Sequence, residues 1–561
     1  MEESGWGAVP TLDYSALLRS RRTQILRWAT TRIPHTDDDS HLTPRPAPLL
    51  RSDSLVLVLI QAATPICCIV WRPLLSEDTH HRLSMKRIFG KLRRRLRHEP
   101  KPATQPPSSA KATPAKTAPA KAAPDAVASE MSVTTPESTT EALPPFSSRA
   151  PDGQADAPLE SLPAEVRHHL LSFLDLGQLK RLVHASPVYH QQYLSGRRLL
   201  LCGLLEGMLG IAAVDAWAAC RASVRRAAGR LTRGKVKGHL QRYQERRSSI
   251  QTYSIRDENL PEKDLVFMVK FHWFVVAPLA RRYTHWALSN LRDESTVEFD
   301  DDETLSQTEE GRLIRALYRF QLCCTLFGNS HLGAPQVTGS RFESVEILVF
   351  FLCLFEPWEV EEIACIYAFA KEKYGQVFGD IKWDVDQTNP KFDGQRPPTP
   401  NGAFDFDNPW AYTTLLRGTI SRGLDLLQAV FGIDDHDQLV SAMQAQITWA
   451  VGNFLEDDAW SESTQFVRRR GRPSEGDEKQ QRKDPMPFEG DSESCPPLAW
   501  TTIWKDTYSN LFGIFMPEAT RLLGYVFWDA PRMESTGACD VVTRQRETDW
   551  RGYDPRDYLL Y

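Results

Sequence analysis

The chain has 561 residues, of which 41% are hydrophobic and 25% charged, and its formal net charge is −5. This composition is ordinary for a globular protein and excludes the global basicity that is typical of nucleic-acid-binding proteins. The ten cysteines form no Cys-x-x-Cys pair and no Cys/His spacing of a zinc site, so we expect buried thiols in a reducing compartment, the cytosol or the nucleus.

Residues 1–84 show no sustained periodicity apart from an apolar segment at 55–71. This segment has about 17 mostly apolar or small residues, the lower end of the length that spans a bilayer. Three interpretations stay open: a membrane anchor, a hydrophobic strand or helix, or translated sequence that is not a genuine part of the protein. The third arises because Met85 begins a second plausible native start.

Residues 85–98 predict a basic amphipathic helix, because Ile88, Leu92 and Leu96 recur at helical spacing among lysines and arginines. Such a helix can contact an anionic membrane, act as a nuclear import signal, or simply be a solvated arm. Residues 99–158 hold twelve of the 38 prolines and one aromatic residue. This segment cannot bury enough apolar surface to offset its ordering entropy, so we expect a disordered linker.

Residues 159–198 carry three helix starts in a row. Pro163 is expected at the first position of the first helix, where its missing N–H costs nothing. Asp175 is expected to cap the second helix, with a glutamine three residues later as in a capping box. Ser186 and Pro187 are expected to begin the third helix.

Apolar residues at helical spacing line the first two of these helices: Val166, Leu170, Leu171, Leu174, Leu179, Leu182 and Val183. Three short helices are smaller than domains that usually stand alone. We therefore expect their apolar surface to dock on a partner or on the domain that follows.

The order Leu-Pro-x-Glu-Val, Phe-Leu-Asp-Leu, Leu-x-x-Leu-Val and Ala-Ser-Pro-x-Tyr in residues 159–198 resembles an F-box, in the divergent form of filamentous-fungal F-box proteins. The resemblance implies docking on the Skp-type adaptor of a cullin-based ubiquitin ligase. It also implies nine residues that enter the adaptor's groove or hold the helices that do: Leu162, Pro163, Val166, Leu170, Leu174, Leu179, Leu182, Val183 and Pro187.

The helical period continues through most of residues 199–561, and strand patterns are few. We therefore predict a mainly α protein: an F-box-like three-helix motif at 159–198, then an irregular all-helical domain at 199–561, behind a disordered N-terminal region. Three stretches of this domain resemble the region downstream of the F-box in the same fungal proteins: 316–321, 355–363 and 524–529. The resemblance assigns no chemistry to them.

A charged, proline-bearing segment at 464–494 predicts a disordered surface insertion. Within it, Arg-Gly-Arg-Pro at 470–473 resembles the core of an AT-hook, in which arginines flanking a glycine enter the A·T minor groove. A solvated loop or a nuclear import signal are the alternatives.

No common catalytic motif is found in the sequence. Two Asp-x-Asp patterns, at 383–386 and 404–407, have the spacing of metal-bound nucleotide-sugar sites, but they lie among loop-forming residues without strand–helix alternation. We therefore predict no catalytic residue, no metal and no cofactor.

The expected function is the substrate adaptor of a Skp–cullin–F-box ubiquitin ligase. Its partners would be the Skp-type adaptor, the cullin complex and an unknown target protein, and neither nucleic acid nor a membrane is expected as a partner. Two alternatives stay open: an interaction scaffold whose F-box-like helices pack on the chain's own domain, and a helical enzyme whose site is built from dispersed residues.

Overall fold

The computed structural model describes residues 159–229, 231–250, 253–299, 304–328, 342–395, 402–450, 455, 459–471 and 473–558. These residues belong to one compact unit, Leu143–Tyr561. They are 72% helical and contain no strand, which confirms the mainly α fold class for this part of the chain. The predictions for the segments 55–71, 85–98 and 99–158 lie outside the described residues.

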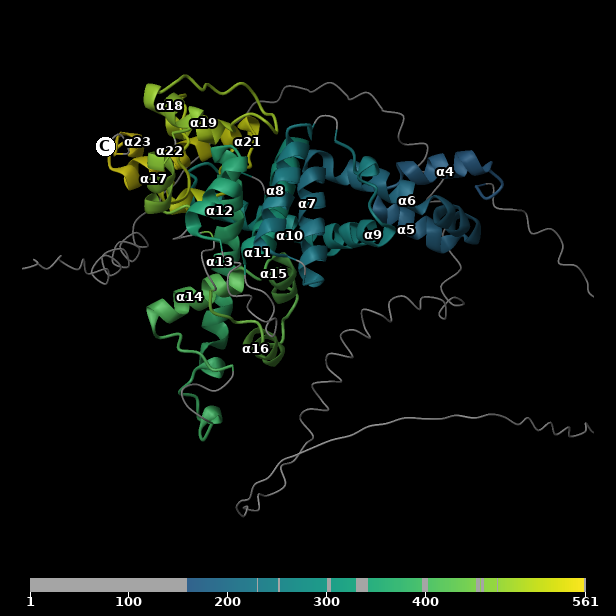
Figure 1. Ribbon diagram of the computed structural model, residues 1–561, viewed down its shortest axis with the longest axis horizontal. Coiled ribbons are helices and arrows are strands. Elements are labelled where there is room, and N and C mark those ends of the chain that lie inside the picture. The colour runs from purple at the N-terminus through teal and green to yellow at the C-terminus, as the bar shows by residue number, and fades with distance from the viewer. Residues whose placement is uncertain are drawn as a thin grey trace, which may run out of the picture. The chain divides into compact units, whose positions relative to one another are not determined.

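The helices of the N-terminal half are α4 (Ala164–Phe173), α5 (Leu176–Ala185), α6 (Pro187–Leu209), η1 (Gly210–Ala212), α7 (Ala213–Ala227), α8 (Arg233–Arg247), η3 (Ile255–Glu258), α9 (Glu262–Phe271), η4 (His272–Val276), α10 (Ala277–Glu294) and α11 (Gln307–Phe327). They are followed by α12 (Ser344–Phe350), η5 (Leu352–Leu354), α13 (Pro357–Val385), η6 (Pro390–Phe392), α14 (Pro409–Ile420), α15 (Leu424–Val430), α16 (His436–Gln444), α17 (Glu462–Gly471), α18 (Glu475–Arg482), α19 (Leu498–Trp504), η8 (Gly513–Phe515), α20 (Glu518–Leu522), α21 (Ala530–Ser535), α22 (Ala538–Trp550) and α23 (Pro555–Tyr558). Figure 1 shows their arrangement.

The predicted caps of the first helices are largely confirmed. Asp175 caps α5 in a capping box, accepting from the Gln178 N–H at 2.8 Å, and Ser186 caps α6 with Pro187 in its first turn. Pro163 differs from the prediction: it is the N-cap of α4, and the helix begins at Ala164. The extended backbone of Pro163, with ψ of 149°, places it just outside the first turn.

The predicted boundary between motif and domain, at residue 198, lies inside the continuous helix α6. No proline lies between Pro187 and Gly210, and the helix ends only at Gly210, whose φ of 49° favours glycine. The third helix of the three-helix motif at 159–198 is therefore also the first helix of the large domain.

The charged insertion expected at 464–494 is also not a disordered loop, because it contains most of α17 and all of α18. A capping box between Ser474 and Asp477 begins α18, and Arg468 donates to the Asp477 carboxylate at 3.0 Å. Arg469 donates to the Asn510 side chain at 2.6 Å. The charges that suggested a solvated loop thus pair with one another and with the domain.

The apolar run at 500–515 does not form one helix, because α19 ends at Trp504. Lys505, Asp506 and Gly513 all have positive φ, which a continuing helix does not allow. The apolar side chains Leu511, Phe512 and Phe515 are therefore buried from short turns and not from one continuous helix.

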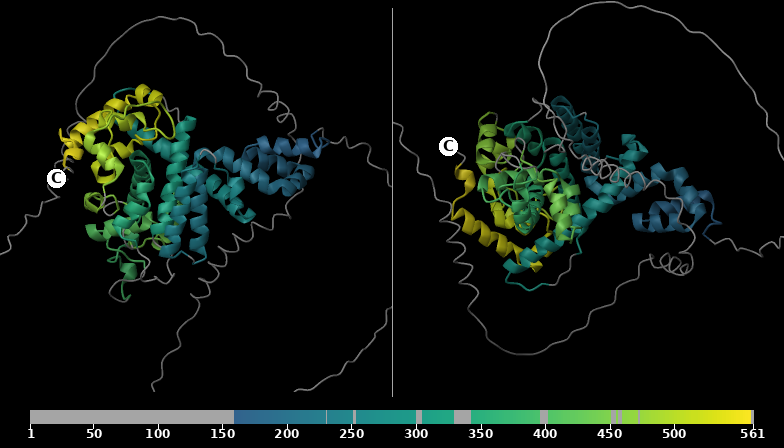
Figure 2. Two further views of the ribbon diagram at one scale, coloured as in Figure 1. Left: turned by 45° about the horizontal axis from the view of Figure 1, so that its top comes forward. Right: turned by 90° about the horizontal axis from the view of Figure 1, so that it is seen from below.

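The main core is centred on α11, which packs along both α7 and α13. The helix α13 is almost entirely buried over its first fourteen residues. Figure 2 shows these helices from two further directions, with α4 and α5 beside α6 and away from the C-terminal helices.

A buried ion network joins these three helices. We define it as Asp215 of α7, Arg315 and Arg319 of α11, and Glu359 and Glu362 of α13, all nearly inaccessible to solvent. Arg319 lies 3.0 Å from Asp215 and 2.9 Å from Glu359, and Arg315 donates to Glu362 at 2.8 Å. Because buried charges are costly unless they are paired, each helix is fixed in register against the others.

The electrostatics of Glu359 follow from this network. Burial raises the pKa of this carboxyl, but Arg319 and then Arg247 outweigh burial and hold its pKa well below the usual range. The Tyr243 hydroxyl of α8 donates to Asp215, which ties a fourth helix to the network.

We predict that Arg315→Met lowers the free energy of unfolding by about 3–5 kcal/mol, because it leaves Glu362 buried without its partner. The double variant Arg315→Met/Glu362→Leu should recover part of this loss. Chemical denaturation followed by circular dichroism measures both. Arg482→Met, which removes an exposed pair with Asp484, is the control and should change little; a single variant at Arg315 as stable as this control contradicts the role of the network.

We also predict an acid-sensitive step from His239 of α8. Its Nδ1 accepts from Arg225 at 3.0 Å, so its Nε2 carries the proton and donates to the Ala218 carbonyl at 3.1 Å. Burial, followed by the charge of Arg225, lowers the pKa of His239 to about 4. Between about pH 6.5, the unfolded value, and pH 4 the unfolded chain binds the extra proton, so stability falls as the pH falls through this window.

The variant His239→Gln should therefore show a smaller loss of unfolding free energy between pH 7 and pH 4 than the wild type. Urea denaturation at a series of pH values measures the difference. Equal pH dependence in the two proteins would show that His239 does not titrate in this way.

Candidate functional site: an exposed face on a three-helix motif

The helices α4, α5 and the N-terminal half of α6 enclose a small core that is separate from the main core. Its buried members are Leu171, Leu179, Val183, Tyr189 and Leu200. Five partly buried residues pack against it: Leu159, Leu170, Leu174, Leu182 and Tyr193. The buried members of this small core all come from the motif, whereas Leu176 of α5 packs against the main core.

The segment before α4 is fastened to α6 by polar contacts. The Tyr189 hydroxyl donates to the Leu159 carbonyl at 2.9 Å, and the Ser186 hydroxyl donates to the Glu160 carboxylate. Arg167 donates to the Leu162 carbonyl at 2.7 Å. These bonds fix the direction in which Leu162 and Pro163 enter the first helix.

The nine residues predicted to serve the adaptor interface fall into three groups. Leu179 and Val183 are buried in the small core and hold the helices together. Four residues are partly buried: Leu162, Leu170, Leu174 and Leu182. Pro163, Val166 and Pro187 are exposed, Val166 with 46% of its surface accessible. The structure therefore separates residues that support the motif from residues that a partner could touch.

The sequence reasoning missed Phe173, the last residue of α4. Its side chain is 75% exposed, and its ring meets the edge of His169 at 4.6 Å between centroids. The available signal was the spacing of seven residues between Val166 and Phe173, which is about two helical turns and places both side chains on one face of α4. Phe173 and Val166 are thus both exposed on α4, and the phenylalanine enlarges the apolar face of the motif.

A second omission concerns the aromatic run at 271–274, for which the sequence predicted only a continuing helical period. The residues His272–Val276 form a π-helix, just before Pro278 in the first turn of α10. The extra residue in this turn changes the register, and Trp273 and Phe274 are exposed at 42% and 60%. The ring of Trp273 lies beside Gly177 at the start of α5, so this turn touches the motif.

The part of the chain that the structure describes is mainly α, and in it a three-helix motif with an exposed apolar face leads directly into a large helical domain. No protein-family model, curated protein or solved structure matches it.

The run Pro187–Ala227 is long and apolar enough to cross a membrane, judged by length and composition alone. More than half of its most apolar window is buried inside the protein, and Asp215 within the run pairs with Arg319 in the core. Core helices of soluble proteins share this length and composition, so the run is accounted for by its packing.

The two Asp-x-Asp patterns lie side by side, because Asp386 pairs with Phe404 in an isolated β-bridge. The first pattern was expected in a loop, but Trp383 and Asp384 belong to the last turn of α13. Across the described ranges, no three histidine, cysteine or acidic side chains come together in a group that could hold a metal ion. Asp407 instead pairs with Lys382.

We predict that Leu179→Ala lowers the stability of the motif and leaves the large domain folded. The truncation creates a cavity in the small core, to which Leu179 belongs, and none in the main core. Hydrogen exchange measured by mass spectrometry should show faster exchange in α4 and α5 and unchanged exchange in α11. Leu194→Ala, which truncates a half-exposed leucine on α6, is the matched control. Equal acceleration in α11 would mean that the two cores unfold together.

Proposed function

We propose that this protein is the substrate adaptor of a Skp–cullin–F-box ubiquitin ligase. The F-box-like motif of α4, α5 and the start of α6 would bind the Skp-type adaptor, and the large helical domain would hold the target protein. The observation that carries the proposal is the exposed apolar face of a motif whose own core is already complete.

The apolar face has the composition expected of a protein interface. Val166 and Phe173 of α4 are exposed, as are Pro163 before α4 and Pro187 at the start of α6. Interfaces are centred on a few apolar anchors that become fully desolvated on binding. Exposure of these apolar side chains to water does not stabilise the isolated chain. Their exposure therefore supports a partner that covers them.

The proposed mechanism is proximity. The chain would bring a target close to the ubiquitin-conjugating enzyme, and no residue of the chain would make or break a bond. Because α6 is both the third helix of the motif and the first helix of the large domain, motion between the two parts is restricted. A stiff connection would hold the target at a fixed distance from the adaptor.

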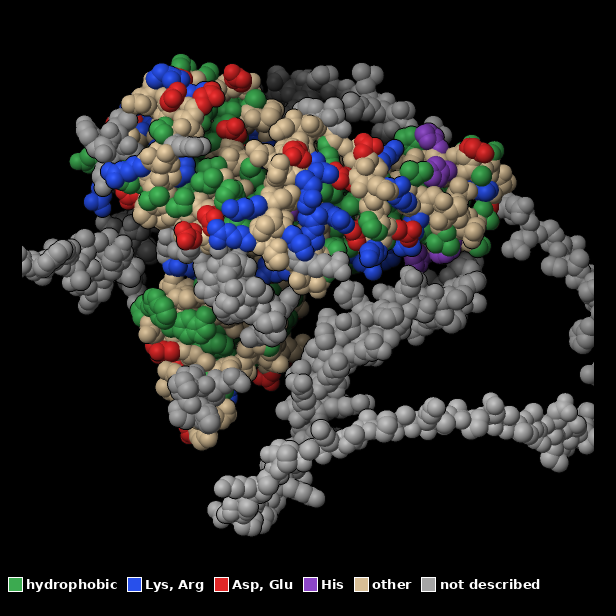
Figure 3. Space-filling view, viewed as in Figure 1, with side chains coloured by type: hydrophobic (Ala, Val, Ile, Leu, Met, Phe, Trp, Pro, Cys, Tyr) green, Lys and Arg blue, Asp and Glu red, His purple; other side chains and the backbone are tan. Residues whose placement is uncertain are grey.

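A tryptophan-rich surface on the large domain supports the target-holding role. Trp410 at the start of α14 is 70% exposed, and its ring lies 5.6 Å from that of Trp449. Trp383, at the end of α13, is exposed as well. Figure 3 shows a hydrophobic area over α14. Tryptophan is enriched among the residues that dominate binding energy in interfaces, so this surface is the place where we propose that the target docks.

One contact favours the alternative of a scaffold that is not part of a ligase. Trp273 of the large domain lies against the start of α5, as expected if the motif packs on the chain's own domain. In that case the apolar face of α4 would have no adaptor to bind. The two functions are separated by adaptor binding itself.

We predict that Val166→Asp abolishes binding of the Skp-type adaptor. Placing a charge in a desolvated hot spot should cost about 2 kcal/mol or more, which is about thirtyfold in Kd. Leu162→Asp should also prevent binding, but Leu162 is partly buried, so its fold must be checked separately. Isothermal titration calorimetry with the purified adaptor measures the affinity.

The control is Gln438→Asp, an exposed position on α16 (His436–Gln444) of the large domain, outside the three-helix motif. It should bind as the wild type does. Wild-type affinity in Val166→Asp would show that the interface is elsewhere, and no binding by the wild type itself would favour the scaffold.

A further inference from the structure

A pocket of about 520 Å³ lies between α10 and α13, beside Phe431 at the end of α15. Its volume is within the range of small-ligand sites in proteins. The sequence analysis assigned no role to this place, and it contains none of the residues of the three-helix motif.

The pocket has an aromatic floor. Phe369 of α13 is buried. Its ring stacks on the Phe431 ring with 5.5 Å between centroids, and the centroid of the Trp286 ring lies 5.1 Å from that of the Phe369 ring. Trp286 and Phe431 are only partly buried, so the floor remains open to an apolar group. An aromatic or apolar group of a ligand would pack on this surface.

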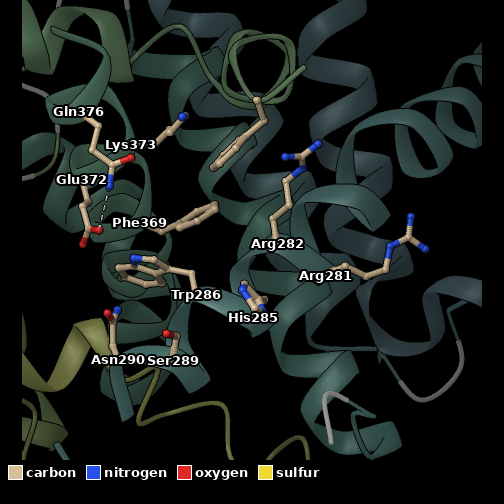
Figure 4. A pocket seen from close by; sticks show the side chains of 11 residues that line it. Arg281, Arg282, His285, Trp286, Ser289, Asn290, Phe369, Glu372, Lys373 and Gln376 are labelled. Atoms are coloured by element: carbon tan, nitrogen blue, oxygen red, sulfur yellow. Dashed lines mark hydrogen bonds between the residues drawn. The ribbon is translucent and has the colours of Figure 1, made fainter. Parts of the chain in front are cut away.

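The wall of the pocket is basic. Arg282 lies over the Phe431 ring at 4.8 Å, and Lys373 lies over the same ring at 5.0 Å, so two cations from different helices share one aromatic face. Figure 4 shows these two side chains reaching toward the same part of the pocket. Arg281 also lines the pocket.

These cations are free to bind an anion. Within the described ranges, neither Arg282 nor Lys373 forms an ion pair with a carboxylate, in contrast to the paired arginines of the core. Glu372 is the acidic residue of the lining and accepts a hydrogen bond from Gln376 at 3.3 Å. Arg282 and Lys373, which share the Phe431 ring, place two positive charges at one end of the pocket, whereas Figure 4 shows the guanidinium of Arg281 pointing away from the aromatic floor.

A ligand with two negative charges matches this lining better than a carboxylate with one. A phosphate monoester carries about −1.5 to −2 at pH 7 and offers several strong acceptor oxygens. Arginine binds such a group through paired, charge-assisted hydrogen bonds. We infer that the pocket between α10 and α13 is a binding site for a phosphate monoester carried on an aromatic or apolar group.

The probe for this test is phenyl phosphate, titrated calorimetrically into the full-length chain. Saturable binding is expected, weaker for inorganic phosphate, which lacks the ring, and for phenol, which lacks the charge. The double variant Arg282→Ser/Lys373→Ser should weaken the affinity by about tenfold or more. Arg242→Ser, which removes an exposed arginine of α8 outside the pocket, should bind as the wild type.

The proposal is overturned if phenyl phosphate does not bind saturably, or if the double variant binds it as tightly as the wild type. Circular dichroism is the control for folding. The double variant should give the wild-type spectrum, because Arg282 is exposed and Lys373 is partly exposed.

Two further ligands distinguish the source of the phosphate. Tighter binding of a capped phosphotyrosine peptide than of adenosine monophosphate supports the site as a reader of phosphorylated proteins, and the reverse order supports a small phosphomonoester. The site does not depend on the proposed ligase function, because these titrations need no adaptor. Loss of adaptor binding in Val166→Asp and loss of phosphate binding in the pocket variant are therefore separate results.

Discussion

The buried ion network between α7, α11 and α13 is the constraint on which the rest of the structure depends. Arg319 contacts carboxylates from both neighbouring helices, so the three helices cannot slide past one another without leaving a charge unpaired in the core. The same principle extends outward, where Glu361 of α13 pairs with Arg521 at 2.8 Å and accepts from the Tyr525 hydroxyl. A rigid framework of this kind positions both the three-helix motif, through α6, and the pocket between α10 and α13.

Two separate cores divide the roles of the chain. The small core around Leu179 completes the three-helix motif, so the exposed apolar residues of α4 are not needed for folding and remain available to a partner. The large domain buries a few paired charges such as Arg319 within an apolar core and exposes aromatic residues such as Trp410. Exposed aromatic residues of this kind are expected of a protein whose surfaces serve binding, and they fit a function based on proximity.

The sequence predicted those features that depend on local chemistry. The caps at Asp175 and Ser186 were identified because hydrogen bonds within a few residues decide where a helix begins. The sequence could not show that α6 continues beyond residue 198, or that Arg468 and Arg469 pair within the fold, because these depend on partners distant in sequence. For the candidate site, spacing identified the apolar face, but only the packing separated buried Leu179 from exposed Val166. The three stretches noted for their resemblance do meet in the core, where they supply much of its buried charge.

The central claim is that another polypeptide covers the exposed face of α4. Hydrogen exchange measured on the full-length chain, with and without a purified Skp-type adaptor, tests this claim most directly. The account predicts slower exchange on adaptor addition in residues 162–176 and at the start of α6, with no change in α11 or α13. Unchanged exchange across α4 and α5 at saturating adaptor would contradict it.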